Sequence, residues 1–302
     1  MSNISDCENH YLARKTLFDK EMKTIQFKVK FWGVRGSLPI PGKNTLEFGG
    51  NTPCVEVRIG KRLLILDGGT GIHHLGEALI RTGQRITADI FITHTHWDHI
   101  HGFPFFAPAF VKGNAFTLHG QGKLNNTFAN LMRGQMMDPH FPILLDQMGA
   151  VIDFQEIHSG VELNLGDGIV VRTIHNNHPG GCLSYRIEQG GRVCCYVTDV
   201  EHYAVPTPHL VKFVQGADLV IYDACYTDEE YAGIPGFPSR VGWGHSTWQE
   251  GIKLVKSAGA KKLVLFHHAT HRTDTDMRKI ERAAQKKYPD CVGAREGAEI
   301  AL

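Results

Sequence analysis

Three histidines and one aspartate fall within the six residues His-Thr-His-Trp-Asp-His at positions 94–99. The run follows a short apolar stretch, 89–93, that predicts a buried strand. Side chains two residues apart on an extended chain point the same way, so His94 and His96 are expected to lie on one face. Burying this many polar groups is costly unless each has a partner, and one divalent ion satisfies several of them together. Nitrogen and carboxylate ligands without thiolate suit zinc, manganese or iron.

Further candidate ligands stand where later strands are expected to end. They are His178 after strand 169–174, Asp199 after the apolar run 193–198, His267 and His268 after strand 262–266, and His245 in Gly-His-Ser-Thr before a helix. Several strands that each deliver such a residue to one edge predict a convergent site. Tandem histidines on a strand face opposite ways, so only one of His267 and His268 is expected to reach a metal.

The segments that position these residues begin with strands. Strict alternation predicts a half-buried strand at 27–31, and two runs, 54–59 and 62–66, predict a hairpin around Gly60-Lys61. Apolar residues at helical spacing follow from Ile72 to Leu79. The stretch 102–149 is rich in loop residues and contains a candidate helix at 124–133.

The second half adds strands first and then alternates strands with helices. Strands are predicted at 151–157, 169–174, 183–187, 192–198, 217–222, 262–266 and near Ile300, and helices at 247–258 and 274–287. Strands that run together and then alternate with helices predict an α/β (α+β) fold of two mixed sheets packed face to face, with helices outside. One domain is expected over 27–302, preceded by an N-terminal extension over 1–26.

The composition excludes several classes of protein. The chain has 302 residues and a formal charge of +1, which argues against bulk electrostatic gripping of long nucleic acid. An apolar share of 42% and a charged share of 21% fit a globular protein, and no apolar run is long enough to span a membrane. The odd number of scattered cysteines, seven, favours reduced thiols and a cytoplasmic location.

Taken together, these motifs resemble the metallo-β-lactamase superfamily from about residue 28 to the end of the chain. The phosphodiesterase branch, with its tRNA 3′-processing nucleases and cyclic-nucleotide and cyclic-phosphate phosphodiesterases, is the most similar. The motifs behind that similarity are Phe-Trp-Gly-Val-Arg-Gly-Ser at 31–37, Gly-Gly-Asn-Thr at 49–52 and Gly-His-Ser-Thr at 244–247. The resemblance implies a four-layer αββα sandwich with a two-metal site at its edge.

The resemblance also implies a ligand set for two divalent ions, with zinc favoured over manganese or iron. One ion would be held by His94, His96 and His178, and the other by Asp98, His99 and His267. Asp199 would bridge both ions. The true lactamases have cysteine at that position, so β-lactam hydrolysis is disfavoured. Asp67, in Asp-Gly-Gly-Thr-Gly, is a candidate to support a ligand histidine from behind.

Such a pair of ions suits the attack of a hydroxide, held between them, on a phosphodiester. Asp98 is expected to orient the hydroxide, and His245 to bind a phosphate oxygen and protonate the leaving alkoxide. Ser246 or Thr247 can cap the helix that follows, which places a helix N-terminus beside an anion. The run 103–108 is a candidate for stacking a nucleobase, although core packing is the expected role of most of its rings.

The leading hypothesis is therefore a hydrolase of small, cyclic-nucleotide-like phosphodiesters. An RNA 3′-end nuclease is the first alternative, ranked lower because those enzymes have a long tRNA-gripping arm and no glycine- and lysine-rich insertion is evident here. A thioester or lactone hydrolase and a non-catalytic ligand sensor are further alternatives. The expected partner is a small phosphodiester, with no stable nucleic-acid partner and no membrane. A homodimer is a further expectation, because relatives often dimerise.

Overall fold

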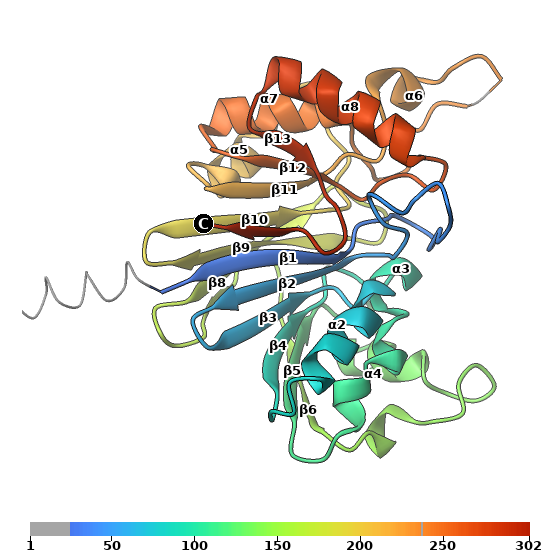
Figure 1. The fold of residues 1–302 in the computed structure, drawn as a ribbon, viewed down its shortest axis with the longest axis vertical. Coiled ribbons are helices and arrows are strands. Elements are labelled where there is room, and N and C mark those ends of the chain that lie inside the picture. The colour runs from blue at the N-terminus through green and yellow to red at the C-terminus, as the bar shows by residue number, and fades with distance from the viewer. Residues whose placement is uncertain (1–24, 237) are drawn as a thin grey trace, which may run out of the picture.

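Two seven-stranded sheets form the centre of the molecule and helices cover their outer faces (Figure 1). This computed structural model describes residues 25–236 and 238–302. The two mixed sheets with helices outside are the predicted architecture. The predicted extension over 1–26 lies almost wholly outside the described residues, so its boundary stays a prediction. No helix among the described residues is long and apolar enough to cross a membrane.

The first sheet places the N-terminal half of the chain beside the C-terminal strand. Its strands are, in spatial order, β14 (Glu299–Ala301), β1 (Phe27–Gly33), β2 (Cys54–Ile59), β3 (Arg62–Leu66), β4 (Thr87–Phe91), β5 (Ala115–Gly120) and β6 (Val151–Glu156). Pairing is antiparallel from β14 to β3 and parallel from β3 to β6. Since parallel strands end at the same edge, the loops after β3 and β4 emerge together.

The second sheet repeats this pattern with the rest of the chain. Its order is β13 (Cys291–Gly293), β12 (Leu263–Phe266), β11 (Leu219–Asp223), β10 (Arg192–Val197), β9 (Cys182–Gln189), β8 (Val170–Asn176) and β7 (Glu162–Asn164). Strands β7 to β10 are antiparallel, and β10 to β13 are parallel. The loops after β10, β11 and β12 therefore also emerge at one edge.

The core between the sheets comes from the inward side of alternating strands. Strand β1 alternates buried and half-buried side chains along its whole length, as its sequence pattern predicts. Phe31 of β1 contacts Phe266 of β12 across the interface, with ring centroids 6.2 Å apart. Tyr185 and Tyr196 join the same buried cluster from β9 and β10. This shared core holds the two strand-end edges in a fixed relation.

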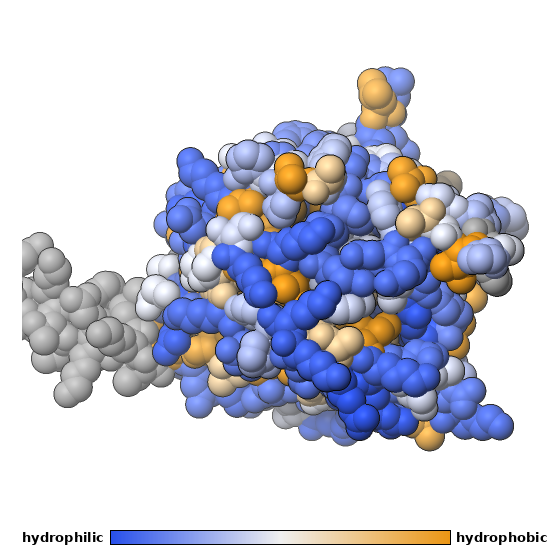
Figure 2. Space-filling model, turned by 90° about the horizontal axis from the view of Figure 1, so that it is seen from above, coloured by the Kyte–Doolittle hydropathy of each residue, from blue (hydrophilic) through white to orange (hydrophobic). Residues whose placement is uncertain are grey.

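Helices complete the outer layers. Helix α2 (Gly71–Ile80) covers the first sheet, while α7 (Trp248–Ala258) and α8 (Asp274–Lys287) cover the second (Figure 1). Seen from above, the face over α7 and α8 is mostly hydrophilic with small scattered apolar patches (Figure 2). Helix α8 explains this appearance, because it buries Met277, Ile280 and Ala284 and turns its charged residues outward. The shorter helices are α3 (Trp97–Ile100), α4 (Phe128–Gly134), α5 (Pro208–Val214) and α6 (Asp228–Ala232).

The structure corrects two sequence predictions in the middle of the chain. The stretch 102–149 was expected to be loops with one helix, yet it contains β5, a strand between β4 and β6. Only Phe116 and Leu118 signal this strand, and pairing on both sides stabilises it. The helix predicted at 124–133 begins at Phe128, because the Thr127 hydroxyl accepts a hydrogen bond from Asn130 N and caps it there.

Candidate metal centre

At the edge where the parallel strands of both sheets end, several residues of the connecting loops have a left-handed backbone. Ser37, Asp67, Asp199 and His267 have φ values of 65°, 62°, 52° and 61°. Each such conformation in a residue other than glycine costs about 1–3 kcal/mol, and such residues gather at functional sites. The sharp turns bring polar side chains from four separate segments to one place.

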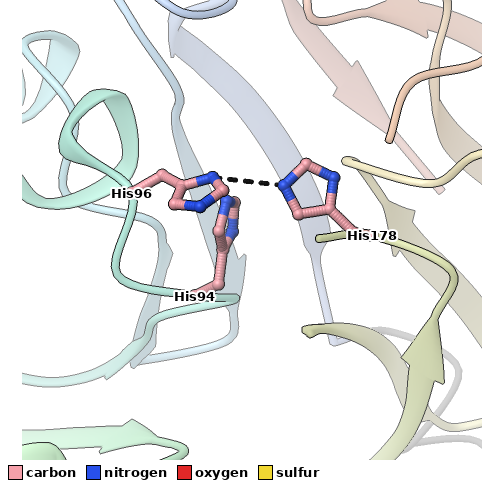
Figure 3. A group of neighbouring side chains, drawn as sticks. All are labelled: His94, His96 and His178. Atoms are coloured by element: carbon pink, nitrogen blue, oxygen red, sulfur yellow. Dashed lines mark hydrogen bonds between the residues drawn. The ribbon is translucent and has the colours of Figure 1, made fainter. Parts of the chain in front are cut away.

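Three imidazoles from both sheets face one another at this edge (Figure 3). His94 and His96 follow β4 of the first sheet, and His178 follows β8 of the second. Their nearest ring nitrogens all lie within 4.8 Å of one another, and His96 Nδ1 is 3.1 Å from His178 Nε2. A single ion can contact all three rings in this arrangement.

A second group of three lies beside the first. Asp98 Oδ2 is 3.3 Å from His99 Nε2 and 3.2 Å from His267 Nε2. The neighbouring His268 points away, with its Nε2 2.9 Å from the carbonyl oxygen of Ala294. The structure thus places His267, and not His268, in the cluster, which the sequence alone left open.

Asp199 lies between the two groups. Its Oδ1 is 3.7 Å from His94 Nε2 and 3.8 Å from His178 Nε2. Its Oδ2 is 3.2 Å from His99 Nε2 and 3.4 Å from His267 Nε2. One carboxylate with an oxygen directed at each group has the arrangement expected of a bridging ligand.

The donor atoms of the cluster fit a bound cation. His94 Nε2 and His99 Nε2 are buried without a hydrogen-bond partner, which is costly unless a metal ion contacts them. Burial lowers the pKa of His94, His96 and His178, so these rings are held in the neutral form that binds metals.

The carboxylates of the cluster attract positive charge. Although burial opposes ionisation, the neighbouring histidines lower the pKa of both Asp98 and Asp199. Burial opposes charging of His99 and His267, but the surrounding carboxylates, Asp199 first among them, together outweigh it and raise the pKa of both rings. Two buried carboxylates that attract protons to the adjacent rings would also attract divalent ions, which can balance their negative charge.

Asp67 supports this cluster from behind, as the sequence predicted. Its Oδ2 accepts hydrogen bonds from His99 Nδ1 at 2.8 Å and from the Tyr196 hydroxyl at 2.9 Å. Its Oδ1 accepts from Thr93 N at 2.8 Å. Because His99 donates through Nδ1, its Nε2 is left free for a metal. The carboxylate also joins the loops of the first sheet to a strand of the second.

His245 lies at the open side of the cluster and is paired with Asp223. Its Nδ1 is 2.8 Å from Asp223 Oδ2, and its ring stacks at 4.8 Å against His267. Burial opposes charging of His245, but the adjacent carboxylate outweighs it and raises the pKa to about 9. Asp223 ends β11 and is fully buried. Asp223 therefore favours the protonated form of the imidazole beside the cluster.

Glu201 holds the loop that contains His245, a role that the sequence analysis did not identify. Its Oε1 accepts from the Tyr231 hydroxyl at 2.7 Å and from Gly242 N at 2.6 Å, and its Oε2 accepts from Gly244 N at 2.9 Å. The Gly244 carbonyl in turn accepts from His178 Nδ1 at 2.8 Å. Glu201 thus orients His178, a predicted ligand, through Gly244. No pattern of residue spacing in the sequence indicates this role.

Gly244 is required at its position for two reasons. Its φ is +84°, and a Cβ there would lie 2.3 Å from His178 Nδ1.

Of the two candidates for capping helix α7, Thr247 is the residue that does so, since its hydroxyl accepts a hydrogen bond from Glu250 N. Ser246 has a different role, because its hydroxyl contacts His202 and Tyr222.

The motif at 31–37 acts on the cluster through a buried arginine. The Arg35 guanidinium donates to the carbonyl oxygens of Gly49, Ala269 and Arg272 at 2.8–3.0 Å. These bonds tie the loop after β1 to the loop after His267. Ser37 N then donates to Asp98 Oδ2 at 2.8 Å. The motif therefore fixes two loops of the cluster.

Comparison with known proteins agrees with this geometry. The beta-lactamase superfamily domain matches residues 64–268, about two thirds of the chain. The chain belongs to this superfamily. Ribonuclease Z of Archaeoglobus fulgidus is 23% identical over 323 residues, which cover 89% of this chain and 96% of the relative. The resemblance predicted from the motifs, to the metallo-β-lactamase superfamily and its phosphodiesterase and tRNA-processing branch, is confirmed.

Solved structures share the fold of this superfamily member. The metallo-beta-lactamase fold protein YhfI from Bacillus subtilis superposes with a TM-score of 0.68 at 19% identity, over 92% of this chain and all of the other. Human tRNase Z, short form, does so with a TM-score of 0.62 at 19% identity, over 90% and 98%. The predicted αββα fold class is therefore confirmed. The chain is a metal-dependent hydrolase of this superfamily.

Proposed function

We propose that this hydrolase cleaves phosphodiester bonds at the 3′ ends of RNA. The observation that supports this most is the near full-length similarity to relatives named ribonuclease Z. These include the protein of Methanosarcina acetivorans, which is 25% identical over 91% of this chain and 98% of its own. The ranking expected from sequence, with small cyclic diesters first, is accordingly reversed.

The predicted ligands divide into two sets in this proposal. His94, His96 and His178 would hold one divalent ion, and Asp98, His99 and His267 the other, with Asp199 between them. Divalent ions in such a site neutralise phosphate charge and make water acidic enough to react near neutral pH. The chain itself fixes the ligand orientation, since Asp67 holds His99 and the Gly244 carbonyl holds His178.

His245 is the proposed proton donor to the leaving oxygen. Its side chain is 12% exposed and lies at the border of the hollow that also reaches His96 and Asp199. Asp223 fixes the ring through Nδ1, so Nε2 is the atom available to an incoming phosphodiester. A positioned acid of this kind contributes about 10²–10⁴ to the rate.

The test compares substrates on the metal-loaded protein. A tRNA precursor with a 3′ trailer, 3′,5′-cyclic AMP and bis-p-nitrophenyl phosphate are each assayed for kcat/KM, with metal content measured on the same sample. We expect the precursor to be cut at its trailer and to be the best substrate. Hydrolysis of a thioester or lactone, with no diester cleaved, would contradict the proposal.

A small cyclic phosphodiester is the second candidate, and one observation favours it. The alignment with the Archaeoglobus relative runs over 323 positions but covers 89% of these 302 residues, about 269, so about 54 positions have no counterpart here. A chain without that material, and with a formal charge of +1, has less surface with which to hold tRNA. Faster turnover of cyclic AMP than of the tRNA precursor would favour this candidate.

Three further expectations stay proposals. We propose zinc as the resident metal, because imidazole and carboxylate ligands suit it, with manganese or iron as the alternatives for metal analysis. A cytoplasmic location is supported by the six described cysteines, which are free and buried. The catalytic domain is proposed to span 27–302. Whether two copies associate stays a prediction.

A further inference from the structure

A wide groove opens directly beside the metal cluster. Its volume is about 750 Å³, and it shares Ser37, Thr95, Trp97 and Asp98 with the hollow of about 400 Å³ over the cluster. Cavities of 300–1,000 Å³ accommodate a small organic group. A molecule whose reacting bond lies at the cluster could thus extend into this groove.

The walls of the groove expose aromatic rings to solvent. Trp97 is 83% exposed and Phe105 is 57% exposed, and Phe105 contacts Phe141 edge to face at 5.5 Å. Aromatic side chains are usually buried in the core, so exposed ones beside a cluster of potential metal ligands indicate a binding surface. By contrast Phe103 and Phe106 are fully buried, as the sequence analysis expected of most rings in that run.

Trp97 is placed by the metal motif itself. It is the first residue of α3, between His96 and Asp98, so its backbone position is fixed by the cluster. A flat ring whose backbone is anchored beside the cluster offers a stacking platform.

The groove offers a phosphate group little positive charge. Among the described residues that line it, none is lysine or arginine, and Asp98 is the one acid, directed at the cluster. His101, Gln135 and His140 line the rim and offer hydrogen-bonding side chains. The groove therefore suits a neutral, planar group with polar edges, which is the chemistry of a nucleobase.

We propose that this groove binds the nucleobase next to the scissile phosphodiester, stacked on Trp97. The inference rests on the proposed phosphodiesterase function, and it adds where the base beside the cleaved bond is held and which side chain holds it. Stacking of one base on an aromatic side chain changes affinity by about ten- to hundredfold. That stacking would position the adjacent phosphate over the cluster.

The kinetic test removes one base at a time. The substrates are the dinucleotide ApA and two versions that have an abasic ribose on the 5′ or the 3′ side of the phosphate. We expect loss of the base on one side to raise KM about ten- to hundredfold with little change in kcat. Trp97→Ala should abolish this discrimination, Trp97→Phe should restore most of it, and Leu124→Ala, at an exposed position outside the groove, should leave it unchanged. Equal losses for all three substrates in Trp97→Ala would overturn the inference.

A binding measurement separates this inference from the proposed function. Calorimetry compares AMP with ribose 5-phosphate on the metal-loaded protein, which needs no turnover. We expect AMP to bind about ten- to hundredfold more tightly, and Trp97→Ala to remove the difference. Base-dependent binding without cleavage of any diester would reject the function and keep the groove assignment. Equal binding of both ligands would reject the groove assignment, whatever the enzyme cleaves.

Discussion

The two sheets contribute to the cluster in different ways. The first sheet supplies its ligands from one short loop, 94–99, after β4. The second sheet supplies single residues from separate segments, namely His178, Asp199, Asp223, His245 and His267. A contiguous motif is specified by local spacing, whereas dispersed residues meet only because strands β8 to β12 are ordered as they are. The second contribution therefore depends on the whole fold.

The halves also differ in what they offer a substrate. Among the residues that the structure describes, those that line the groove beside the cluster all lie between 37 and 141, in the first half of the chain. The proton donor His245, its partner Asp223 and the loop support Glu201 all belong to the second half. Substitutions in the groove outside the ligands should thus affect mainly KM, and those of His245, Asp223 and Glu201 should affect mainly kcat or metal affinity.

The largest effect is expected at Asp199, where the two contributions meet. Asp199→Ala removes the one carboxylate that faces both groups of ligands, so both ions should be lost or weakened. We expect activity to fall at least about a thousandfold, together with metal content measured by mass spectrometry. Asp153→Asn, an exposed carboxylate on β6, is the control. Full metal content in Asp199→Ala would contradict a bridging role.

This dependence on fold also decides what the sequence could reveal. The hairpin at 54–66 and helix 274–287 form as expected, because periodicity identifies them. The side chains proposed as ligands lie together at one edge, where the ends of the predicted strands suggested that they would meet. Strand β5 was missed, since six residues with two large apolar side chains are stabilised mainly by their neighbours. Glu201 was missed for a similar reason. Its hydrogen-bond donors come from residues 231–244, and only the folded chain brings them to it.

The next effect is expected at His245. His245→Ala should lower kcat by about 10²–10⁴ and leave metal content unchanged, because the side chain donates a proton and does not belong to either ligand group. Asp223→Asn, which keeps the shape but removes the charge beside the ring, should give a smaller loss. Turnover and metal content are measured on the same preparations. Loss of metal in His245→Ala would reassign this residue as a ligand.

A smaller effect is expected at Glu201. Glu201→Gln places an amide where three donors now point, so the loop 242–245 should loosen and His178 should lose its fixed orientation. Removal of such a supporting group costs about 10- to 100-fold in metal affinity or activity. Titration with a chelator measures the affinity. Glu162→Gln, which removes an exposed partner of Arg172, is the control and should change neither quantity.

Carboxylates that accept several hydrogen bonds in the second half should also make it the more acid-sensitive region. The smallest effect is expected at Glu230. Partial burial opposes ionisation of Glu230, but hydrogen bonds from His271 and Thr227 N and the charge of Arg272 outweigh it and lower the pKa from 4.5 to about 2. A carboxyl group whose pKa is lowered by folding stabilises the folded state at pH values above its ordinary pKa. This contribution is lost as the pH falls from about 4.5 towards 2.

Thermal unfolding of the wild-type protein and Glu230→Gln, followed across this pH range, measures that contribution. At neutral pH the substitution should cost about 1 kcal/mol or less, because solvent screens the partly exposed pair. The two melting temperatures should converge as the pH falls below about 4, and hydrogen exchange should show α6 losing protection before β2 to β4. A difference in melting temperature that stays constant down to pH 2.5 would mean that the ionised Glu230 does not stabilise α6.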